Sequence, residues 1–102
     1  MMRLVLAPLA ESDLSLILTY LRREAGTGTA EKYRARFRRT FDQLRRFPES
    51  GAPRPDLSAK LRIAVIHPYV IFYDFDQAAG LLEVWRVLHG KASVHERLMR
   101  GP

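Results

Sequence analysis

The sequence predicts an α+β fold in which a helical hairpin packs on one face of a small, mostly antiparallel sheet. Two stretches with helical apolar periodicity follow one another in the first half of the chain. Three β-rich segments separated by short turns fill the second half, and one short strand precedes the helices. The predicted order is therefore β-α-α-β-β-β. A chain of 102 residues has the length of one domain, so we expect residues 1–102 to form a single unit.

The first elements are predicted to be a strand and a helix. Residues 3–7 are typical of a short strand, which Pro8 interrupts. Proline suits the first turn of a helix, because that position needs no amide hydrogen for the helical ladder. The helix is expected to run from Pro8 to about Glu24. Its apolar face follows helical spacing at Leu14, Ile17, Leu18 and Leu21.

A glycine turn is predicted to separate this helix from a second one. Gly26 and Gly28 supply the turn and Thr29 is a suitable N-cap, so the second helix is expected from about Ala30 to Phe47. An aromatic stripe within about 80° of the helical wheel follows it. We interpret this stripe as part of the core rather than as a base-stacking platform, because so small a chain needs its aromatic residues for its core. The stripe consists of Tyr33, Phe37, Phe41 and Leu44.

Three strands are predicted after a proline-rich loop that begins at Pro48. They occupy residues 61–66, 69–75 and 81–89, with a corner at His67-Pro68. Consecutive strands with short turns pair as an antiparallel meander. Strict alternation in the last strand would place two sets of side chains on opposite faces. These sets are Leu82, Val84, Arg86 and Leu88, and Glu83, Trp85, Val87 and His89.

Positive charge is concentrated on the second predicted helix. The chain has a formal net charge of +6, and residues 30–47 contribute seven basic and two acidic side chains, a net +5. This concentration indicates an acidic partner, either a nucleic acid or an acidic polypeptide. A solvated, arginine-rich helix face is the alternative interpretation.

The sequence favours a cytoplasmic protein with no membrane partner. It contains no cysteine, which excludes disulfides, thiolate catalysis and cysteine-ligated metals. The apolar run at its start is too short for a signal-peptide core. The longest uncharged apolar stretch, "IAVIHPYVIFY", is about half a membrane span and contains Pro68.

Motifs for catalysis, metal binding or cofactor binding are not found in the sequence. No serine stands in a nucleophile-elbow context, and there is neither a phosphate-cradling glycine loop nor an H-E-x-x-H motif. Asp74 and Asp76 are interpreted as turn-supporting residues, and His89 and His95 have no third ligand nearby in the sequence. We therefore expect no catalytic residues, no metal and no cofactor. Arg86 is either an ion-paired structural residue or an anion-binding one.

Three stretches together resemble the ParE branch of the RelE/ParE toxins. They are "ESDLSLILTYL", "FPESG" and "LRIAVIHPYVIFYDFDQAAGLLEVWRVLHGK", and the resemblance covers nearly the whole chain. It implies the toxin component of a type II toxin–antitoxin system, a non-enzymatic inhibitor of DNA gyrase. It also implies a ParD-like antitoxin that forms a hetero-oligomer with the toxin and neutralises it. The antitoxin would bind operator DNA, so no sequence-specific DNA binding is expected of this chain.

The resemblance leaves two alternatives open. The RelE-like branch cleaves mRNA on the ribosome with basic residues and often an aromatic one, but here Val70 and Ala92 stand where that branch commonly has arginine. The tail has no tyrosine and offers only His95 as a titratable substitute. Because Ala92-Ser93 also departs from the Arg-Asp often found in ParE-like chains, a degenerate toxin that only binds its antitoxin is the second alternative.

Two sets of basic residues are the candidate binding sites. The target-binding candidates are strand-associated, and the antitoxin-binding candidates lie on the basic second helix. The target-binding set is Arg62, Arg86, His89 and Lys91. The antitoxin-binding set is Arg34, Arg38 and Arg45.

Overall fold

The computed structural model describes residues 1–90. Lys91, Ala92 and His95, with the rest of the tail, lie outside the described residues. The order of elements is β1 (Arg3–Leu6), α1 (Pro8–Ala25), α2 (Thr27–Arg46), the 3-10 helix η1 (Pro48–Ser50), β2 (Ala52–Pro53), β3 (Arg62–Ile66), β4 (Tyr69–Asp76) and β5 (Leu81–His89). The predicted α+β order is confirmed, with η1 and the two-residue β2 added inside the expected loop.

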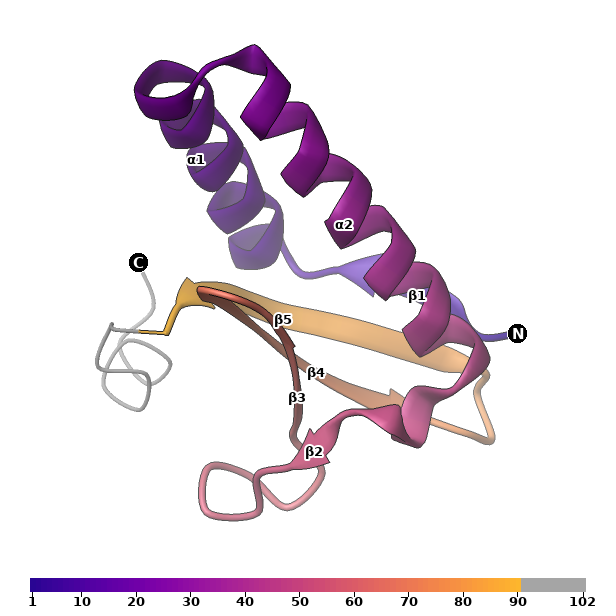
Figure 1. Cartoon of the computed structure of the whole chain (residues 1–102). Helices are drawn as coiled ribbons and strands as arrows, with labels where there is room; N and C mark the ends of the chain where they lie inside the picture. The colour runs from indigo at the N-terminus through magenta and orange to yellow at the C-terminus, as the bar shows by residue number, and fades with distance from the viewer. Residues whose placement is uncertain (91–102) are drawn as a thin grey trace.

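The strands form one mixed sheet in the order β1-β5-β4-β3-β2. β1 runs parallel to β5, with Leu4 opposite Leu82, and the other neighbours are antiparallel. The predicted meander is therefore correct for β3, β4 and β5. The helical hairpin covers one face of this sheet (Figure 1). No helix in residues 1–90 is long and apolar enough to cross a membrane.

The turn between the helices is shorter than predicted. Gly26 alone joins them, with φ of 92°, and its N–H donates to the carbonyl oxygen of Arg22. Glycine adopts this positive φ without the steric cost that a Cβ brings. Because one residue reverses the chain, α2 begins at Thr27 and includes Gly28 in its first turn. The prediction of Thr29 as the N-cap is wrong.

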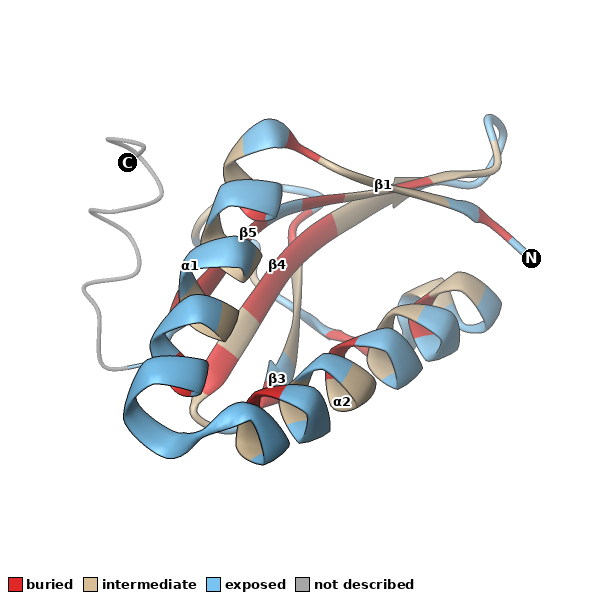
Figure 2. Cartoon of the chain, turned by 90° about the horizontal axis from the view of Figure 1, so that it is seen from above, coloured by how far each residue is buried: buried red, intermediate tan, exposed pale blue. Residues whose placement is uncertain are grey.

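The main core lies between the helices and the sheet. Figure 2 shows buried residues along β4 and β5 and on the sides of both helices that face the sheet. Phe37 and Leu44 are buried, and Tyr33 and Phe41 pack against the same cluster. The aromatic stripe of α2 is therefore a core element, as predicted. From the sheet, the cluster receives Tyr69, Ile71, Tyr73, Leu82, Val84 and Val87.

A β-bulge in β5 changes which side chains face the helices. Phe72 lies opposite Arg86 and Tyr73 lies opposite Val84, so Trp85 is an extra residue on β5. The predicted strict alternation is wrong for this reason, because an extra residue exchanges the two faces beyond it. Val87 joins the core under the helices. Leu88 packs instead with Leu61 and Phe72 in a second cluster.

Candidate functional site: a basic groove on the helical hairpin

A groove of about 570 Å³ lies between α1, α2 and β1. Its lining combines large apolar side chains with charged ones. The apolar residues are Leu4, Leu14, Leu18, Phe37 and Phe41. The charged residues are Arg3, Arg34, Arg38, Asp42 and Arg45. A groove of this composition suits a partner that is both apolar and acidic.

The charges that line the groove are mostly accessible. Four arginines and one aspartate give a net charge of +3. Arg34 Nε lies 3.7 Å from Glu31, and Arg45 Nη1 lies 3.6 Å from Asp42. Both pairs are substantially exposed, so they contribute little to stability and remain able to exchange partners. These arginines therefore give the groove a positive potential.

Arg45 differs from its neighbours because it also supports the N-terminus. Its Nε donates to the carbonyl oxygen of Met2 at 3.0 Å, and the N–H of Met2 donates to the carbonyl oxygen of Arg45 at 3.0 Å. These two hydrogen bonds hold the start of β1 against the end of α2. A substitution at Arg45 would therefore alter the shape of the groove as well as its charge.

All three arginines proposed from the sequence as antitoxin-binding residues line this groove. Arg34, Arg38 and Arg45 follow helical spacing, so one flank of α2 carries them together. Arg3 also lines the groove but was not proposed. Its place depends on the parallel pairing of β1 with β5, which no local sequence pattern reveals.

The groove adjoins an edge strand of the sheet. Within residues 1–90, β1 is the terminal strand, and its strand partner is β5. An edge strand offers backbone N–H and C=O groups to an incoming segment. A partner chain lying along the groove would thus meet side chains of the hairpin and the backbone of β1.

Arg62, one of the target-binding candidates, braces a loop. Its Nη1 donates to the carbonyl oxygens of Glu49 at 2.9 Å and Gly51 at 2.7 Å. Tyr73 holds the same segment, since its hydroxyl accepts from Gly51 N at 2.9 Å and donates to the carbonyl oxygen of Pro48 at 2.7 Å. Burial raises the pKa of Tyr73 above its ordinary value, which keeps this phenol protonated as a donor. The "FPESG" segment is therefore fixed to the sheet.

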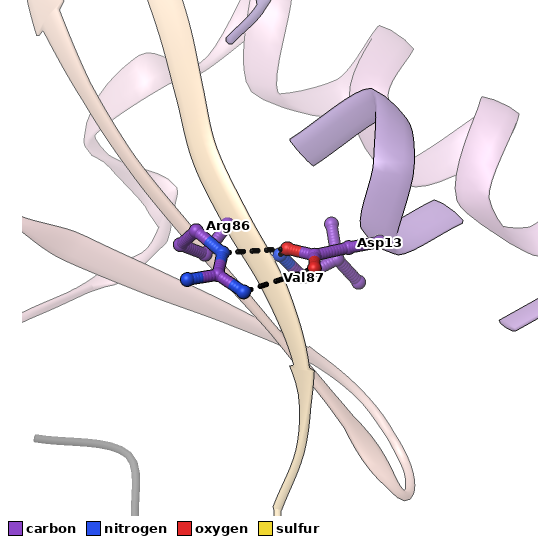
Figure 3. Close-up of polar contacts among 3 residues, drawn as sticks. All are labelled: Asp13, Arg86 and Val87. Carbon is purple, nitrogen blue, oxygen red and sulfur yellow. Dashed lines mark hydrogen bonds and ion pairs between the residues drawn. The ribbon is translucent and has the colours of Figure 1, made fainter. Parts of the chain in front are cut away.

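Arg86 is buried in an ion pair with Asp13 of α1 (Figure 3). Its Nε donates to Asp13 Oδ2 at 2.8 Å, and its Nη2 donates to Oδ1 at 3.0 Å. Hydrogen bonding to Asp13 raises the pKa of Arg86 further above its ordinary value. Because its side chain is only 3% exposed, Arg86 is an ion-paired structural residue, which is one of the two roles that the sequence allowed. This burial counts against its assignment as a target-binding residue.

Asp13 also takes the place of a strand partner along the part of β5 that β1 does not reach. β1 ends at Leu6, and the N–H of the next residue, Ala7, donates to the carbonyl oxygen of Val84 at 2.9 Å. Further along β5, the N–H of Val87 donates to Asp13 Oδ2 at 2.9 Å (Figure 3). The Asp13 carboxylate thus accepts hydrogen bonds both from the backbone of Val87 and from the side chain of the preceding residue, Arg86.

His89 belongs to an aromatic row at the end of β5. Its ring meets Tyr69 in a T-shaped arrangement with centroids 5.8 Å apart, and Tyr69 meets Tyr33 in the same way at 5.8 Å. Burial raises the pKa of Tyr69 above its ordinary value. Arg62, Arg86 and His89 therefore have three different environments in the described part of the chain.

Of the two aspartates at the end of β4, Asp74 and Asp76, one has the local role that was expected. Asp76 Oδ1 accepts from Ala79 N at 3.2 Å and so supports the turn before β5. Asp74 lines a separate, largely apolar hollow with Trp85 and Leu57. Within the described part of the chain, no three His, Asp or Glu side chains come together as a group that could hold a metal ion.

Comparisons with known proteins show the family of the chain and a likeness of its fold. The family model described as "ParE toxin of type II toxin-antitoxin system, parDE" matches residues 4–94. A solved structure, "Chromosomal ParDE TA system from P. aeruginosa", matches with a TM-score of 0.72 and 20% identity. That match covers 87% of this chain and 96% of the other. No curated protein sequence matches the chain.

The fold is that of a small α+β domain, similar to the fold in a solved ParDE system. The family model spans most of the length of the chain. The chain therefore belongs to the ParE toxin family of type II toxin–antitoxin systems, as its resemblance implied.

Proposed function

We propose that this ParE-family toxin acts by binding DNA gyrase and that a ParD-type antitoxin neutralises it. The main support for an antitoxin partner is the groove between α1, α2 and β1, which is lined by apolar side chains and by charged ones with a net charge of +3. The similar solved structure is titled as a ParDE system, which supports a ParD partner for this chain. Membership of the ParE family supports the gyrase target, which the resemblance to the ParE branch implies.

The proposed antitoxin segment is amphipathic and acidic. Its apolar side chains would bury against Leu14, Leu18 and Phe41, which supplies the affinity. Its carboxylates would pair with Arg34 and Arg38. Exposed charges of this kind accelerate association and select for an acidic partner more than they add affinity.

Two observations favour binding over the alternative, RNA cleavage by a ribosome-dependent ribonuclease. Cleavage needs a base for the 2′-hydroxyl and cations for the developing phosphate charge. Burial raises the pKa of both Tyr69 and Tyr73, so neither phenol is a base at neutral pH. The guanidinium groups of Arg62 and Arg86 bind backbone carbonyls and Asp13.

The groove is tested with the double variant Arg34→Ala/Arg38→Ala. Both side chains line the groove, and neither makes the contact that Arg45 makes with Met2. At low salt we expect roughly tenfold weaker binding of the ParD-type antitoxin encoded beside the toxin gene, mainly through a slower association rate. Isothermal titration and stopped-flow association measure both quantities. Arg22→Ala/Arg23→Ala, with the same charge change at the exposed end of α1, is the matched control.

An unchanged affinity of the groove variant at low salt would refute the assignment of this basic flank. The target is tested separately by induced expression and by supercoiling assays with the purified chain. Blocked supercoiling with induction of the DNA-damage response supports gyrase. Rapid translation arrest with cleaved messages and unaffected gyrase would support the ribonuclease alternative, and no growth effect would indicate a degenerate toxin.

A further inference from the structure

The cations of α2 form two separate rows. The inner row is Arg34, Arg38 and Arg45, which line the groove. The outer row is Lys32, Arg36, Arg39 and Arg46. Since successive residues of a helix are about 100° apart, the two rows lie on different flanks of α2. The helix therefore presents one basic flank to the groove and another to solvent.

Both acidic residues of α2 form their ion pairs with the inner row. Glu31 pairs with Arg34, and Asp42 pairs with Arg45. No outer-row side chain forms an ion pair within residues 1–90. Four positive charges thus stand along one flank without a compensating carboxylate on their own helix.

From Lys32 to Gln43 the surroundings of the outer row are polar, unlike those of the groove, whereas Arg46 at its end lines a hollow with Met1 and the exposed Phe47. Lys32, Arg39 and Arg46 are charged positions on the outside of the helix, and Gln43 continues the same flank. Arg36 lies over the ring of Tyr33, with its guanidinium carbon 5.0 Å from the ring centroid, so it covers an aromatic surface. Between Lys32 and Gln43 an acidic amphipathic peptide would find no exposed large apolar side chain to pack against. This stretch therefore suits a partner whose charge is carried without apolar side chains.

We propose that the outer row binds the phosphate backbone of a nucleic-acid duplex without reading its sequence. From Lys32 to Arg46 the row extends about 21 Å along the helix axis. A duplex carries one negative charge per about 1.7 Å of its length, so a row of this length faces several phosphates. Contacts to phosphates fix position but carry no sequence information. This role goes beyond gyrase and antitoxin binding and does not depend on either.

The test compares two triple variants of the full-length chain that have the same reduction in charge. The outer variant is Lys32→Gln/Arg39→Gln/Arg46→Gln, which retains Arg36 over Tyr33. The control is Arg3→Gln/Arg34→Gln/Arg38→Gln, which removes three charges from the groove. Both variants fall from a net charge of +6 to +3. Matching far-UV circular dichroism and melting temperatures establish that both are folded.

Binding is measured by fluorescence anisotropy with labelled 20-base-pair duplexes of DNA and of RNA over a range of salt concentrations. For the unaltered chain we expect the logarithm of the binding constant to fall linearly with the logarithm of salt. In the outer variant the slope should become shallower by about 0.9 for each phosphate that is no longer neutralised, and affinity at low salt should fall roughly tenfold or more. At about 0.15 M salt, where the Debye length is about 8 Å, the control should change less than about threefold, because charges on the other flank of the helix are largely screened.

Three results would overturn the proposal. One is the absence of salt-dependent duplex binding by the unaltered chain. Another is an equal reduction of affinity in both variants, which would indicate a general effect of net charge. The third is displacement of the duplex by polyglutamate at the same charge concentration, which would indicate a preference for acidic polypeptide. Weaker binding of the outer variant to DNA, RNA or both supports the proposal, and comparing the two duplexes identifies the source of the phosphates.

Discussion

At the scale of single residues, Asp13 connects two elements that are distant in the sequence. Its carboxylate receives two hydrogen bonds from Arg86 and one from the backbone of Val87, 73 and 74 positions further along the chain. Asp13 and Arg86 are 11% and 3% exposed, so their charges are held in a region with little water. A buried charge is stable in the fold only while its partner is present.

We predict that Asp13→Ala destabilises the fold by roughly 3–5 kcal/mol. The substitution removes the acceptor that now receives the N–H groups of Arg86 and Val87. Urea unfolding followed by tryptophan fluorescence measures the difference, since Trp85 precedes Arg86. Asp13→Asn keeps one acceptor oxygen and should be less destabilising. A change below about 1 kcal/mol for Asp13→Ala would contradict the structural role assigned to this pair.

At the scale of elements, the segment after α2 is locked against the sheet. Tyr73 and Arg62 bind its carbonyl and amide groups from β4 and β3. Gly51 is required there by space and not by backbone conformation, because its φ is −76°. A Cβ at this position would meet the hydroxyl of Tyr73 and would lie 2.6 Å from the carbonyl oxygen of Ile63. Neither neighbour can move without breaking a hydrogen bond or a strand contact.

Gly51→Ala is therefore expected to destabilise the protein by about 1–3 kcal/mol, as overpacking does elsewhere. Chemical unfolding measures the difference. Gly28→Ala is the matched control, because a Cβ there has no neighbour within 4 Å and alanine favours a helix. We expect the control to be neutral or slightly stabilising. Equal stability of the Gly51 variant and the unaltered chain would contradict this, because it would show that the segment around Gly51 can move away from the sheet at no cost.

The elements that were predicted correctly are those with a clear local period. The stripe at Tyr33, Phe37, Phe41 and Leu44 is helical in spacing, and the strands between residues 61 and 89 carry apolar runs bounded by turns. The bulge at Trp85 was missed because apolar residues stand on both sides of it, so a change of face leaves no trace in the pattern.

Part of the candidate site was also predictable. Arg34, Arg38 and Arg45 share one helix flank by spacing alone, and the structure places them in one groove. Arg3 lines the groove beside residues of α1 and α2, and Asp13 pairs with Arg86. In both cases the partners are distant in the sequence. Such contacts depend on the strand order β1-β5-β4, which composition and periodicity do not specify.

At the scale of the whole molecule, the groove joins the helical hairpin to the edge of the sheet. α1, α2 and β1 all contribute to its lining, and in the described part of the chain β1 pairs with β5 alone. A ligand seated there would connect the hairpin to this edge strand. Antitoxin binding should consequently stabilise the toxin as well as mask it, because any ligand that binds only the folded state shifts the unfolding equilibrium.

We predict that a ParD-type antitoxin in excess raises the unfolding temperature of the toxin. At one hundred times the dissociation constant the stabilisation is about 2.7 kcal/mol. For a domain of this size that corresponds to a shift of roughly 10–20 °C. Differential scanning calorimetry measures the shift, and Arg34→Ala/Arg38→Ala should show a smaller one at the same antitoxin concentration. If saturating antitoxin left the melting temperature unchanged, binding would not involve the folded groove, since occupation of a surface that exists only in the native state must stabilise it.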